Sequence, residues 1–348
     1  MMTHQGDAAR YLCSVIVPVY NGAATIAHCL DALAQQSILP AAYEIIVVDD
    51  GSTDNTSQLV TAWCKAHPQI HCQQVHQNNS GPAAARNRGA AVAQGPLLLF
   101  TDADCRPCAT WIETFTALFA ADPTVSAAMG AYTSEQSAPA ARFAQLEFEA
   151  RYAGMRTQPT VDIVATYSAA FRRDVFLKEK GFDPSFPKAN NEDVEFSYRL
   201  SRQGYRMVFA PAATVAHPHV PTWWGYARTK LGRAFWRTIV YKRYPAKAIK
   251  DSYTPQTLKL QIVLAPLCLL GLLWTLGQRA AVGLLLCVPF FLTTIPMLRF
   301  AYRQQPGVMP WVPWGLWLRS IVFALGVSWA LVTHRQAEQL ILDDSASR

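Results

Sequence analysis

Charged side chains are scarce in this sequence. Only 16% of its 348 residues are charged and 51% are hydrophobic, proportions unusual for a wholly soluble protein. We therefore expect a membrane-embedded part beside a soluble one, and the length allows about two domains. Residues 1–10 lack an apolar core, so we expect no secretory signal peptide there.

Several well-known motifs are also missing. No G-x-G-x-x-G follows the first predicted strand and no G-x-x-x-x-G-K-[ST] occurs, which argues against dinucleotide-binding and P-loop folds. The absence of G-x-S-x-G and H-E-x-x-H argues against hydrolases and metalloproteases of those types. The eight cysteines are scattered, which favours a reduced compartment. Cys105 and Cys108 form one C-x-x-C without a second pair, and we interpret them as small loop residues rather than a zinc or redox site.

The first half of the chain alternates strand and helix patterns. Strands are predicted at 13–19, 43–48, 70–76 and 97–101, with helices over 23–36, about 54–67 and from Pro82 to just before Gly95. Alternation of this kind predicts a parallel sheet with crossover helices, whose ligands bind at the carboxyl ends of the strands. Polar clusters at 49–50, 78–86 and 102–104 all fall at that edge. One ligand could therefore touch all three.

The stretch 98–104 organises this half. An apolar run suited to a buried strand ends in Asp102 and Asp104. Strand geometry places the two on one side, and paired carboxylates suit a divalent cation that also holds a diphosphate. A lone D-x-D is more often a solvated acidic turn, but the neighbouring polar clusters favour the metal site.

Five blocks resemble a family 2 glycosyltransferase with the GT-A fold, of the membrane-anchored bacterial type. They are SVIVPVYNG at 14–22, EIIVVDDGSTD at 44–54, GPAAARNRG at 81–89, TDAD at 101–104 and NEDVE at 191–195. The resemblance covers about residues 13–210. It implies an α/β fold (a Rossmann-like mixed sheet with flanking helices), a nucleotide-sugar donor, Mg²⁺ or Mn²⁺ as cofactor, and an inverting, metal-dependent transfer.

The resemblance also assigns roles to individual residues. Four would line the nucleoside pocket: Pro18, Tyr20, Asp50 and Arg86. Asp102 would lie near the ribose and at the metal, and Asp104 would bind the metal on the donor diphosphate. Asp193 would be the general base, with Glu192 beside it as a second candidate catalytic residue.

The chemistry independently requires such groups. The departing diphosphate must be neutralised, and a base must take the proton of the acceptor hydroxyl. Asn191 is predicted to cap a helix whose first turn holds Glu192 and Asp193, and a helix N-terminus favours an ionised carboxylate. These acids could instead only complement the helix dipole, but the four blocks upstream favour the base.

The region that follows is less specific. A helix is predicted at 141–156 and strands at 165–171 and 205–210, the last ending at Pro211. His217 and His219 follow on an extended segment. Two interpretations of them stay open: His217 approaches the metal or diphosphate, or the two histidines form a surface pair.

The segment 228–250 contains eight basic residues and no acid. Apolar residues recur there at roughly helical spacing, and a basic amphipathic helix before a membrane segment is typical of a helix lying on an anionic leaflet. A nucleic-acid-binding strip has the same charge, but no other feature supports it, and we expect no nucleic-acid partner. Residues 232–236 lack the Q-x-x-R-W block of processive synthases. We therefore expect transfer of one or a few sugars.

Three apolar spans are predicted, at 260–277, 280–298 and 311–333. Arg319 in the third lies near its start, where its side chain could snorkel to the headgroups; a surface or re-entrant third helix is the alternative. The basic residues that flank the first two spans favour the cytoplasmic side of the membrane. We therefore expect a multi-pass protein of the bacterial cytoplasmic membrane whose catalytic domain faces the cytoplasm. The expected domains are 1–221 (catalytic), 222–256 (interfacial), 257–335 (membrane) and 336–348 (tail).

The sequence therefore predicts a glycosyltransferase of cell-surface glycan synthesis, bound to the lipid bilayer. Its acceptor would be presented at the membrane, most simply on a polyprenyl lipid. Two alternatives are a processive polysaccharide synthase and a non-catalytic nucleotide-sugar-binding subunit for glycan export. The D-x-D and E-D blocks argue against the binding subunit, which has no need of a base.

Overall fold

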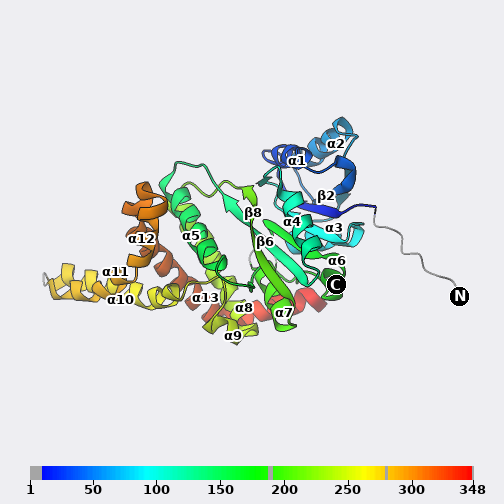
Figure 1. The fold of residues 1–348 in the computed structure, drawn as a ribbon. Helices are drawn as coiled ribbons and strands as arrows, with labels where there is room; N and C mark the ends of the chain where they lie inside the picture. The colour runs from blue at the N-terminus through cyan, green and yellow to red at the C-terminus, as the bar shows by residue number, and fades with distance from the viewer. Residues whose placement is uncertain (1–9, 187–190, 279–280, 347–348) are drawn as a thin grey trace. The chain divides into compact units, whose positions relative to one another are not determined.

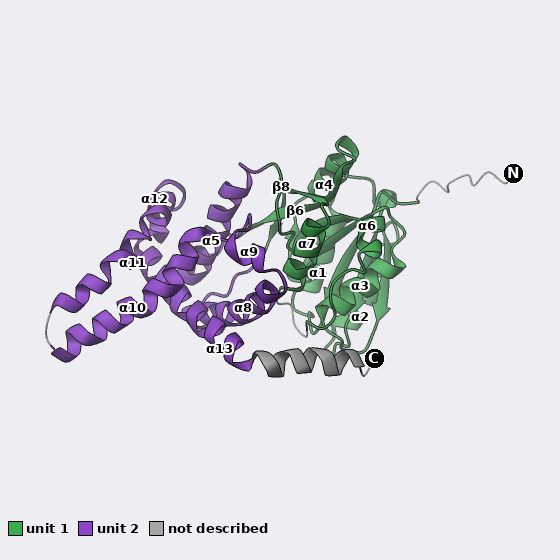
Figure 2. Ribbon diagram, turned by 90° about the horizontal axis from the view of Figure 1, so that it is seen from below, with its two compact units in different colours: residues 1–133, 159–217 green, residues 134–158, 218–348 purple. Residues whose placement is uncertain are grey.

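The computed structural model describes residues 10–186, 191–278 and 281–346, with side chains described as far as Thr333. The chain forms two compact units, coloured separately in Figure 2. Unit 1 comprises residues 1–133 and 159–217, and unit 2 comprises residues 134–158 and 218–348. The segment 134–158 thus leaves unit 1 between two of its strands and belongs with the C-terminal half of the chain.

Unit 1 is built on one eight-stranded sheet with the order β3-β2-β1-β4-β7-β6-β8-β5. Its strands are β1 (Cys13–Val19), β2 (Tyr43–Asp49), β3 (His71–His76), β4 (Leu97–Thr101), β5 (Arg106–Pro107), β6 (Val125–Thr133), β7 (Ser168–Arg172) and β8 (Arg206–Ala216). β3, β2, β1 and β4 run parallel, as the alternating pattern predicts. β7 pairs antiparallel with both β4 and β6, so the sheet is mixed.

The inner parallel strands β1, β2 and β4 are mainly apolar because the sheet is covered on both faces there. All residues of β2 and β4 are buried, as expected of parallel strands between helices. The helices of unit 1 are α1 (Ile26–Ala34), α2 (Thr56–Ala66), α3 (Pro82–Val92), α4 (Trp111–Ala121), α6 (Arg173–Lys178) and α7 (Glu192–Arg202), with a short 3₁₀ turn at Pro40–Ala42. Figure 1 shows α3 beside β2, and α3 packs on both β1 and β2.

Phenylalanine rings hold α6 and α7 against the sheet. Phe100 of β4 and Phe171 of β7 pack on the rings of Phe176, Phe182 and Phe196, with centroids 5.4–6.2 Å apart. The packing of α3 depends on a glycine instead. A Cβ on Gly89 would lie 2.5 Å from Ile16 Cγ2, so only glycine lets this helix approach β1 so closely.

Several elements of unit 1 differ from the sequence prediction. β6 and α4 were not predicted, since β6 is a run of small residues with little β-branching. The strand predicted at 205–210 continues past Pro211 as β8 to Ala216. Its register against β6 shifts between Met129 and Ala131, and at this irregularity Pro211 has no ladder hydrogen bond to donate.

Unit 2 is helical. Its helices are α5 (Pro139–Met155), α8 (Trp223–Arg243), α9 (Pro245–Ile249), α10 (Gln256–Gln278), α11 (Val288–Leu292), α12 (Ile295–Gln304) and α13 (Val312–Ala346), with 3₁₀ turns at Ala281–Leu286 and Pro306–Trp311. α10 packs against α13 and against the segment of the first 3₁₀ turn. An apolar cluster that includes Phe143 of α5 and Phe290 of α11 joins these helices.

Among the described residues, two helices are long and apolar enough to cross a membrane, namely Gln256–Gln278 and Pro306–Thr333. The span predicted at 280–298 is not a straight helix. Ala281–Leu292 and Ile295–Gln304 are bent by 53° at a break, so together they form either a broken span or a re-entrant loop. Residue 280 lies outside the described residues.

Two further expectations for unit 2 are wrong. Lys230, one of the eight basic residues of the segment expected to lie on the leaflet, is buried. Arg319 does not reach outward from its helix: it is 3% exposed and its Nη1 donates to Glu147 Oε1 over 2.7 Å. Helical periodicity cannot reveal these reversals, because a buried carboxylate on another helix attracts both cations inward.

Candidate active site

The loops after β1 and β2 are tied together at the carboxyl edge of the sheet. Asn21, with a φ of 52°, accepts hydrogen bonds at Oδ1 from the backbone N–H groups of Thr53 and Asp54. The Asn21 N–H in turn donates to Ser52 Oγ over 2.9 Å. This hydrogen-bond network of short polar residues fixes the ends of β1 and β2 relative to each other. A rigid edge of this kind can hold a nucleotide.

Asp50 organises the next loop. Its carboxylate is 4% exposed and accepts from the N–H groups of Ser80 and Gly81 and from Gln77 Nε2, over 2.7–2.9 Å. Gly81 has a φ of +86°, a conformation that favours glycine, and it starts α3. Asp50 thus shapes the loop that carries the GPAAARNRG block.

The two remaining residues of the expected nucleoside pocket lie beside Asp50. Pro18 ends the buried run of β1 and is half-buried, and Tyr20 follows the strand with 52% of its surface exposed. An exposed aromatic ring at the carboxyl end of a parallel strand is placed to stack on a flat ligand. The structure thus brings Pro18, Tyr20 and Asp50 to one edge of the sheet.

Arg86 is the candidate site residue on α3, and it is buried. It is 2% exposed, and its guanidinium joins two acids: Nη1 donates to Glu192 Oε1 and Nη2 to Asp102 Oδ1, both over 2.7 Å. The D-x-D loop is thereby linked to the first turn of α7. The sequence places Arg86 beside a nucleoside but gives no sign of this bridge, because its partners lie on distant segments.

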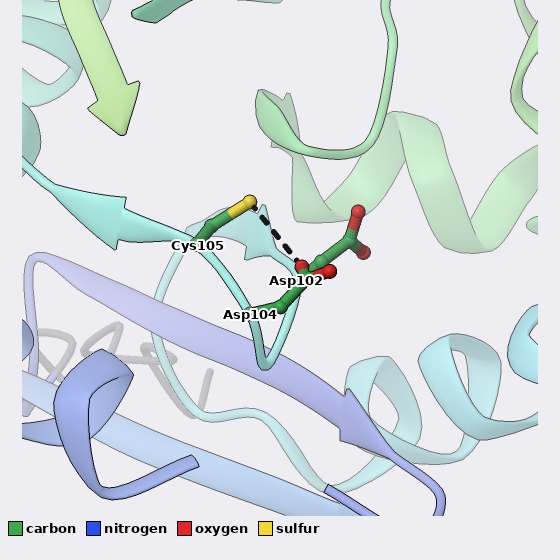
Figure 3. Close-up of side chains that lie close together, drawn as sticks. All are labelled: Asp102, Asp104 and Cys105. Carbon is green, nitrogen blue, oxygen red and sulfur yellow. Dashed lines mark hydrogen bonds between the residues drawn. The ribbon is translucent and has the colours of Figure 1, made fainter. Parts of the chain in front are cut away.

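Asp102 and Asp104 turn toward the same place, as the D-x-D pattern predicts. Ligand atoms of Asp102, Asp104 and Cys105 all lie within 4.8 Å of one another. Figure 3 shows the Cys105 thiol turned toward the aspartates, with its hydrogen bond to Asp104 dashed. Burial raises the pKa of that thiol well above its ordinary value. Cys105 therefore stays protonated and is a poor ligand for a hard cation.

His217 also reaches this group. Its Nε2 lies 3.5 Å from Asp104 Oδ2. Burial works against ionisation of Asp104, but the hydrogen bond and charge of His217 outweigh it and lower the pKa of Asp104 below its ordinary value. The His217 ring stacks on Tyr132, with centroids 4.5 Å apart, and Tyr132 stacks on Tyr167 at 3.5 Å. Of the two interpretations of His217, the structure supports the approach to the D-x-D.

The donor set fits a divalent cation. Asp104 and His217 offer a carboxylate and an imidazole, and Asp102 keeps Oδ2 free of its bond to Arg86. Oxygen and imidazole ligands suit Mn²⁺, and carboxylates suit Mg²⁺. His219 takes no part in this group. It is 7% exposed, belongs to unit 2 and bonds Gln145 there, so the expectation of a surface histidine pair is wrong.

The acidic block forms the first turn of α7, as predicted. Asp193 is half-buried, accepts from the N–H of Val194 over 2.8 Å, and lies 3.4 Å from the N–H of Thr166. Asn191 precedes the helix with a φ of 67°, and its side chain makes no cap hydrogen bond. The expected Asn191 cap is therefore wrong, because a left-handed residue cannot present its side chain to the first turn as an ordinary N-cap does.

Glu192 has a different environment from Asp193. It is 2% exposed, and its Oε2 has no hydrogen-bond partner among the described residues. Burial raises the pKa of Glu192 to about 7, against the attraction of Arg86 and with repulsion from Asp193. Glu192 is thus held by Arg86, while Asp193 stays the more exposed of the two acids.

Three residues of the site were not predicted from the sequence. Tyr132 and Tyr167 form the aromatic wall beside His217, and Cys105 lies against the aspartates. Only Cys105 had a signal, its position next to Asp104. The tyrosines lie on β6 and just before β7, so their relation to the site depends on the antiparallel half of the sheet.

A mixed sheet whose carboxyl edge carries a D-x-D, a nearby imidazole and an acidic helix start is the architecture of a glycosyltransferase that uses nucleotide-sugars. Comparison with known proteins agrees. Residues 14–179 match the model of glycosyl transferase family 2, and residues 97–331 match that of glycosyl transferase family group 2. The chain belongs to the family 2 glycosyltransferases and has the GT-A fold. It is an enzyme that transfers a sugar from a nucleotide-sugar.

Curated relatives are also glycosyltransferases. Glycosyltransferase AglE of Haloferax volcanii is 27% identical over 213 residues, which cover 60% of this chain and 67% of the relative. Pre-mycofactocin glycosyltransferase of Mycobacterium tuberculosis is 31% identical over 214 residues, covering 59% of this chain and 42% of the relative. The chain thus spans less than half the length of that second relative.

A solved structure resembles nearly the whole chain. The mannosyltransferase PcManGT of Pyrobaculum calidifontis, in complex with GDP-Man and Mn²⁺, has a TM-score of 0.59 and 24% identity. The likeness covers 92% of this chain and 88% of that protein. At this identity it supports the fold.

Proposed function

We propose that this protein is a metal-dependent, inverting glycosyltransferase that acts on an acceptor presented at a membrane, in the synthesis of a cell-surface glycan. One observation carries the proposal. Asp104 lies 3.5 Å from His217 beside Asp102, and Arg86 connects this group to the helix turn that holds Asp193. A cation site and a candidate base are thereby held in one unit.

Asp104, His217 and the second oxygen of Asp102 would hold Mg²⁺ or Mn²⁺. The bound ion would neutralise the negative charge of the departing diphosphate. PcManGT, with the same fold, binds Mn²⁺ and GDP-Man, which supports a nucleotide diphosphate donor here. Pro18, Tyr20, Asp50 and the loop that starts α3 would then contact the nucleoside.

Asp193 would act as the general base. It takes the proton of the acceptor hydroxyl while that oxygen attacks the anomeric carbon, and the bond to the diphosphate breaks on the opposite face of the sugar. A single displacement of this kind inverts the anomeric configuration. Arg86 would position the two carboxylates that its guanidinium contacts, Glu192 and Asp102.

The membrane part of the proposal rests on unit 2. Two helices are long and apolar enough to span a bilayer, and α8 carries exposed cations such as Arg228 and Arg233 suited to an anionic leaflet. We propose a bacterial cytoplasmic membrane protein with its catalytic domain (1–221) facing the cytoplasm and a polyprenyl-linked acceptor. The segment 222–256 would lie at the interface and 257–335 in the bilayer.

The test uses the full chain purified in detergent with a panel of nucleotide-sugars and a membrane lipid extract. We expect release of one nucleoside diphosphate with Mn²⁺ and none with EDTA or in Asp104→Ala. Asp193→Asn should lower kcat by about 10²–10⁴ while donor affinity stays unchanged. Asp174→Asn, an exposed acid in the first turn of α6, is the matched control.

Three outcomes would contradict the proposal. Near-normal turnover in Asp193→Asn would remove this residue from the mechanism. Retention of the anomeric configuration in the product, read by NMR, would exclude the single displacement. Turnover that survives EDTA would exclude metal dependence.

A further inference from the structure

Unit 2 contains a group of charged side chains that the transfer reaction does not use. We call it the Glu147 cluster, and it consists of Glu147 and Arg151 on α5, Lys230 on α8 and Arg319 on α13. Glu147, Lys230 and Arg319 are 1%, 4% and 3% exposed, and the side chain of Arg151 is 9% exposed. Such groups are seldom buried, so their purpose needs a physical account.

The Glu147 carboxylate accepts three hydrogen bonds. Lys230 Nζ donates to Oε2 and Arg319 Nη1 to Oε1, each over 2.7 Å. Tyr226 adds its hydroxyl to Oε2 over 2.8 Å. Arg151 lies farther off, 3.9 Å from Oε1, and its guanidinium donates to the hydroxyl of Tyr253.

The cluster has more positive charge than it neutralises. Within the described parts of the chain, Glu147 is the sole carboxylate within 4.0 Å of Arg151, Lys230 or Arg319. Three cations against one carboxylate leave two positive charges inside the unit. Arg319 Nε is also buried, with no hydrogen-bond partner among the residues that the structure describes. Uncompensated buried charge is costly.

The state of Lys230 agrees with this surplus. Burial lowers the pKa of its ammonium to about 7, against the attraction of Glu147, and repulsion from Arg151 and Arg233 adds to the effect. A purely structural link between α5, α8 and α13 would need only one cation for one carboxylate. The two additional cations therefore indicate a ligand of opposite charge.

The position of the cluster indicates which ligand. Arg319 and its partner Gln261, 2.5 Å from Arg319 Nη2, lie in the two helices that are long enough to span a membrane. Ionisable groups in such helices commonly mark ligand sites. A phosphate monoester carries about two negative charges at neutral pH, which matches the surplus, and guanidinium groups bind phosphate well.

We propose that the Glu147 cluster binds the phosphate monoester headgroup of a membrane lipid. Arg151 and Arg319 supply the guanidinium donors, and Lys230 adds a point charge. A phosphodiester carries one negative charge, so it leaves part of the positive charge of the cluster uncompensated and binds less tightly. Identification of this lipid with the sugar acceptor would rest on the proposed function, but binding itself requires neither donor nor turnover.

The test measures binding to the full chain, delipidated in detergent, by native mass spectrometry. Three probes are compared: phosphatidic acid, phosphatidylglycerol and inorganic phosphate alone. We expect phosphatidic acid to bind at least about tenfold more tightly than phosphatidylglycerol, since one additional charge-assisted hydrogen bond is worth about that factor. Equal binding of the two lipids would overturn the proposal. Inorganic phosphate that binds as well as phosphatidic acid would overturn its lipid part.

Two variants separate a binding site from a structural link. Arg151→Gln should weaken phosphatidic acid binding about tenfold, while Arg156→Gln, exposed at the end of the same helix, should not change it. Glu147→Gln removes the competing carboxylate, so it should tighten binding. Unchanged binding in Arg151→Gln, or weaker binding in a folded Glu147→Gln, would show that the cluster only holds the helices together.

Discussion

The Arg86 bridge leads to a prediction whose size follows from the structure. The Arg86 and Glu192 side chains are each 3% exposed and lie 2.7 Å apart, whereas Asp102, the other partner, is 30% exposed. Two unit charges about 4 Å apart interact by about 4 kcal/mol at an effective dielectric constant of about 20. This sets a ceiling for the pair with Glu192. Water screens the pair with Asp102, which should contribute about 1 kcal/mol.

The coupling between Arg86 and Glu192 should depend on pH. Burial raises the pKa of Glu192 to about 7, so at pH 6 Arg86 faces a mostly neutral carboxyl and the coupling should be near zero. Above pH 7 the carboxyl ionises, and the coupling should grow by about 1.4 kcal/mol per pH unit. It should reach about 1.5 kcal/mol at pH 8 and about 3 kcal/mol at pH 9.

The same shift affects overall stability. Because the pKa of Glu192 rises from 4.5 in a model compound to about 7 in the folded state, the folded protein binds this proton more readily than the unfolded chain. The contribution is fully present below about pH 4.5 and is lost as pH rises through about 7. Glu192→Gln cannot ionise, so across that window it should gain about 3 kcal/mol relative to the wild type.

A double-mutant cycle measures both effects. Wild type, Arg86→Met, Glu192→Gln and the double variant are unfolded with urea in detergent at pH 6, 8 and 9, and followed by tryptophan fluorescence. A cycle of Arg86→Met with Asp102→Asn is the comparison and should give the smaller coupling at pH 9. Coupling that is equal at pH 6 and pH 9 would refute the raised pKa of Glu192. Coupling below about 0.5 kcal/mol at pH 9 would refute the stabilising role of the buried pair.

Two further predictions concern unit 1 and its packing. Tyr132→Ala removes the ring stacked on His217 and should weaken Mn²⁺ binding about tenfold, as loss of support behind a metal ligand does. Tyr132→Phe keeps the ring and should bind Mn²⁺ as the wild type does. Electron paramagnetic resonance of free Mn²⁺ measures both affinities, and equal affinities of the two variants would exclude the positioning role of Tyr132. Gly89→Ala places a Cβ 2.5 Å from Ile16 Cγ2 and should cost about 1–3 kcal/mol of stability. A Cβ on Gly154, which lies in a helix, would have nothing within 4 Å, so Gly154→Ala should instead stabilise the protein by about 0.5–1 kcal/mol. Thermal melts in which Gly89→Ala and Gly154→Ala shift the melting temperature in the same direction would contradict the packing argument.

The parallel half of the sheet could be predicted because its signals are local. β1 and β4 have the predicted ends, and β2 is one residue longer. Buried parallel strands are continuous apolar runs, and each is followed by a turn residue or an acid. The antiparallel half could not be predicted in the same way. β6 is rich in alanine, and its pairing with β7 and β8 brings together segments far apart in the sequence.

The candidate site shows the same division. The D-x-D could be placed at the sheet edge from the order of strands and helices, so Asp102 and Asp104 were predictable there, whereas the sequence connects Asp193 with them only through the family resemblance. The bridge of Arg86 to Glu192 was not, because it joins residues 106 positions apart. The side-chain cap of Asn191 failed for a local reason, since the residue adopts a left-handed conformation that no neighbour in the sequence announces.

Unit 2 illustrates why charge on a helix is harder to interpret than hydrophobicity. A basic residue before a membrane span is expected to face water or headgroups, and the other cations of the segment 228–250 give no reason to single out Lys230. It turns inward because Glu147, 83 positions upstream, offers a carboxylate. That carboxylate lies on α5, between two strands of unit 1 in the sequence and yet within unit 2. Both the inward cations and their charge surplus therefore follow from the excursion of residues 134–158, which hydropathy and motif patterns do not reveal.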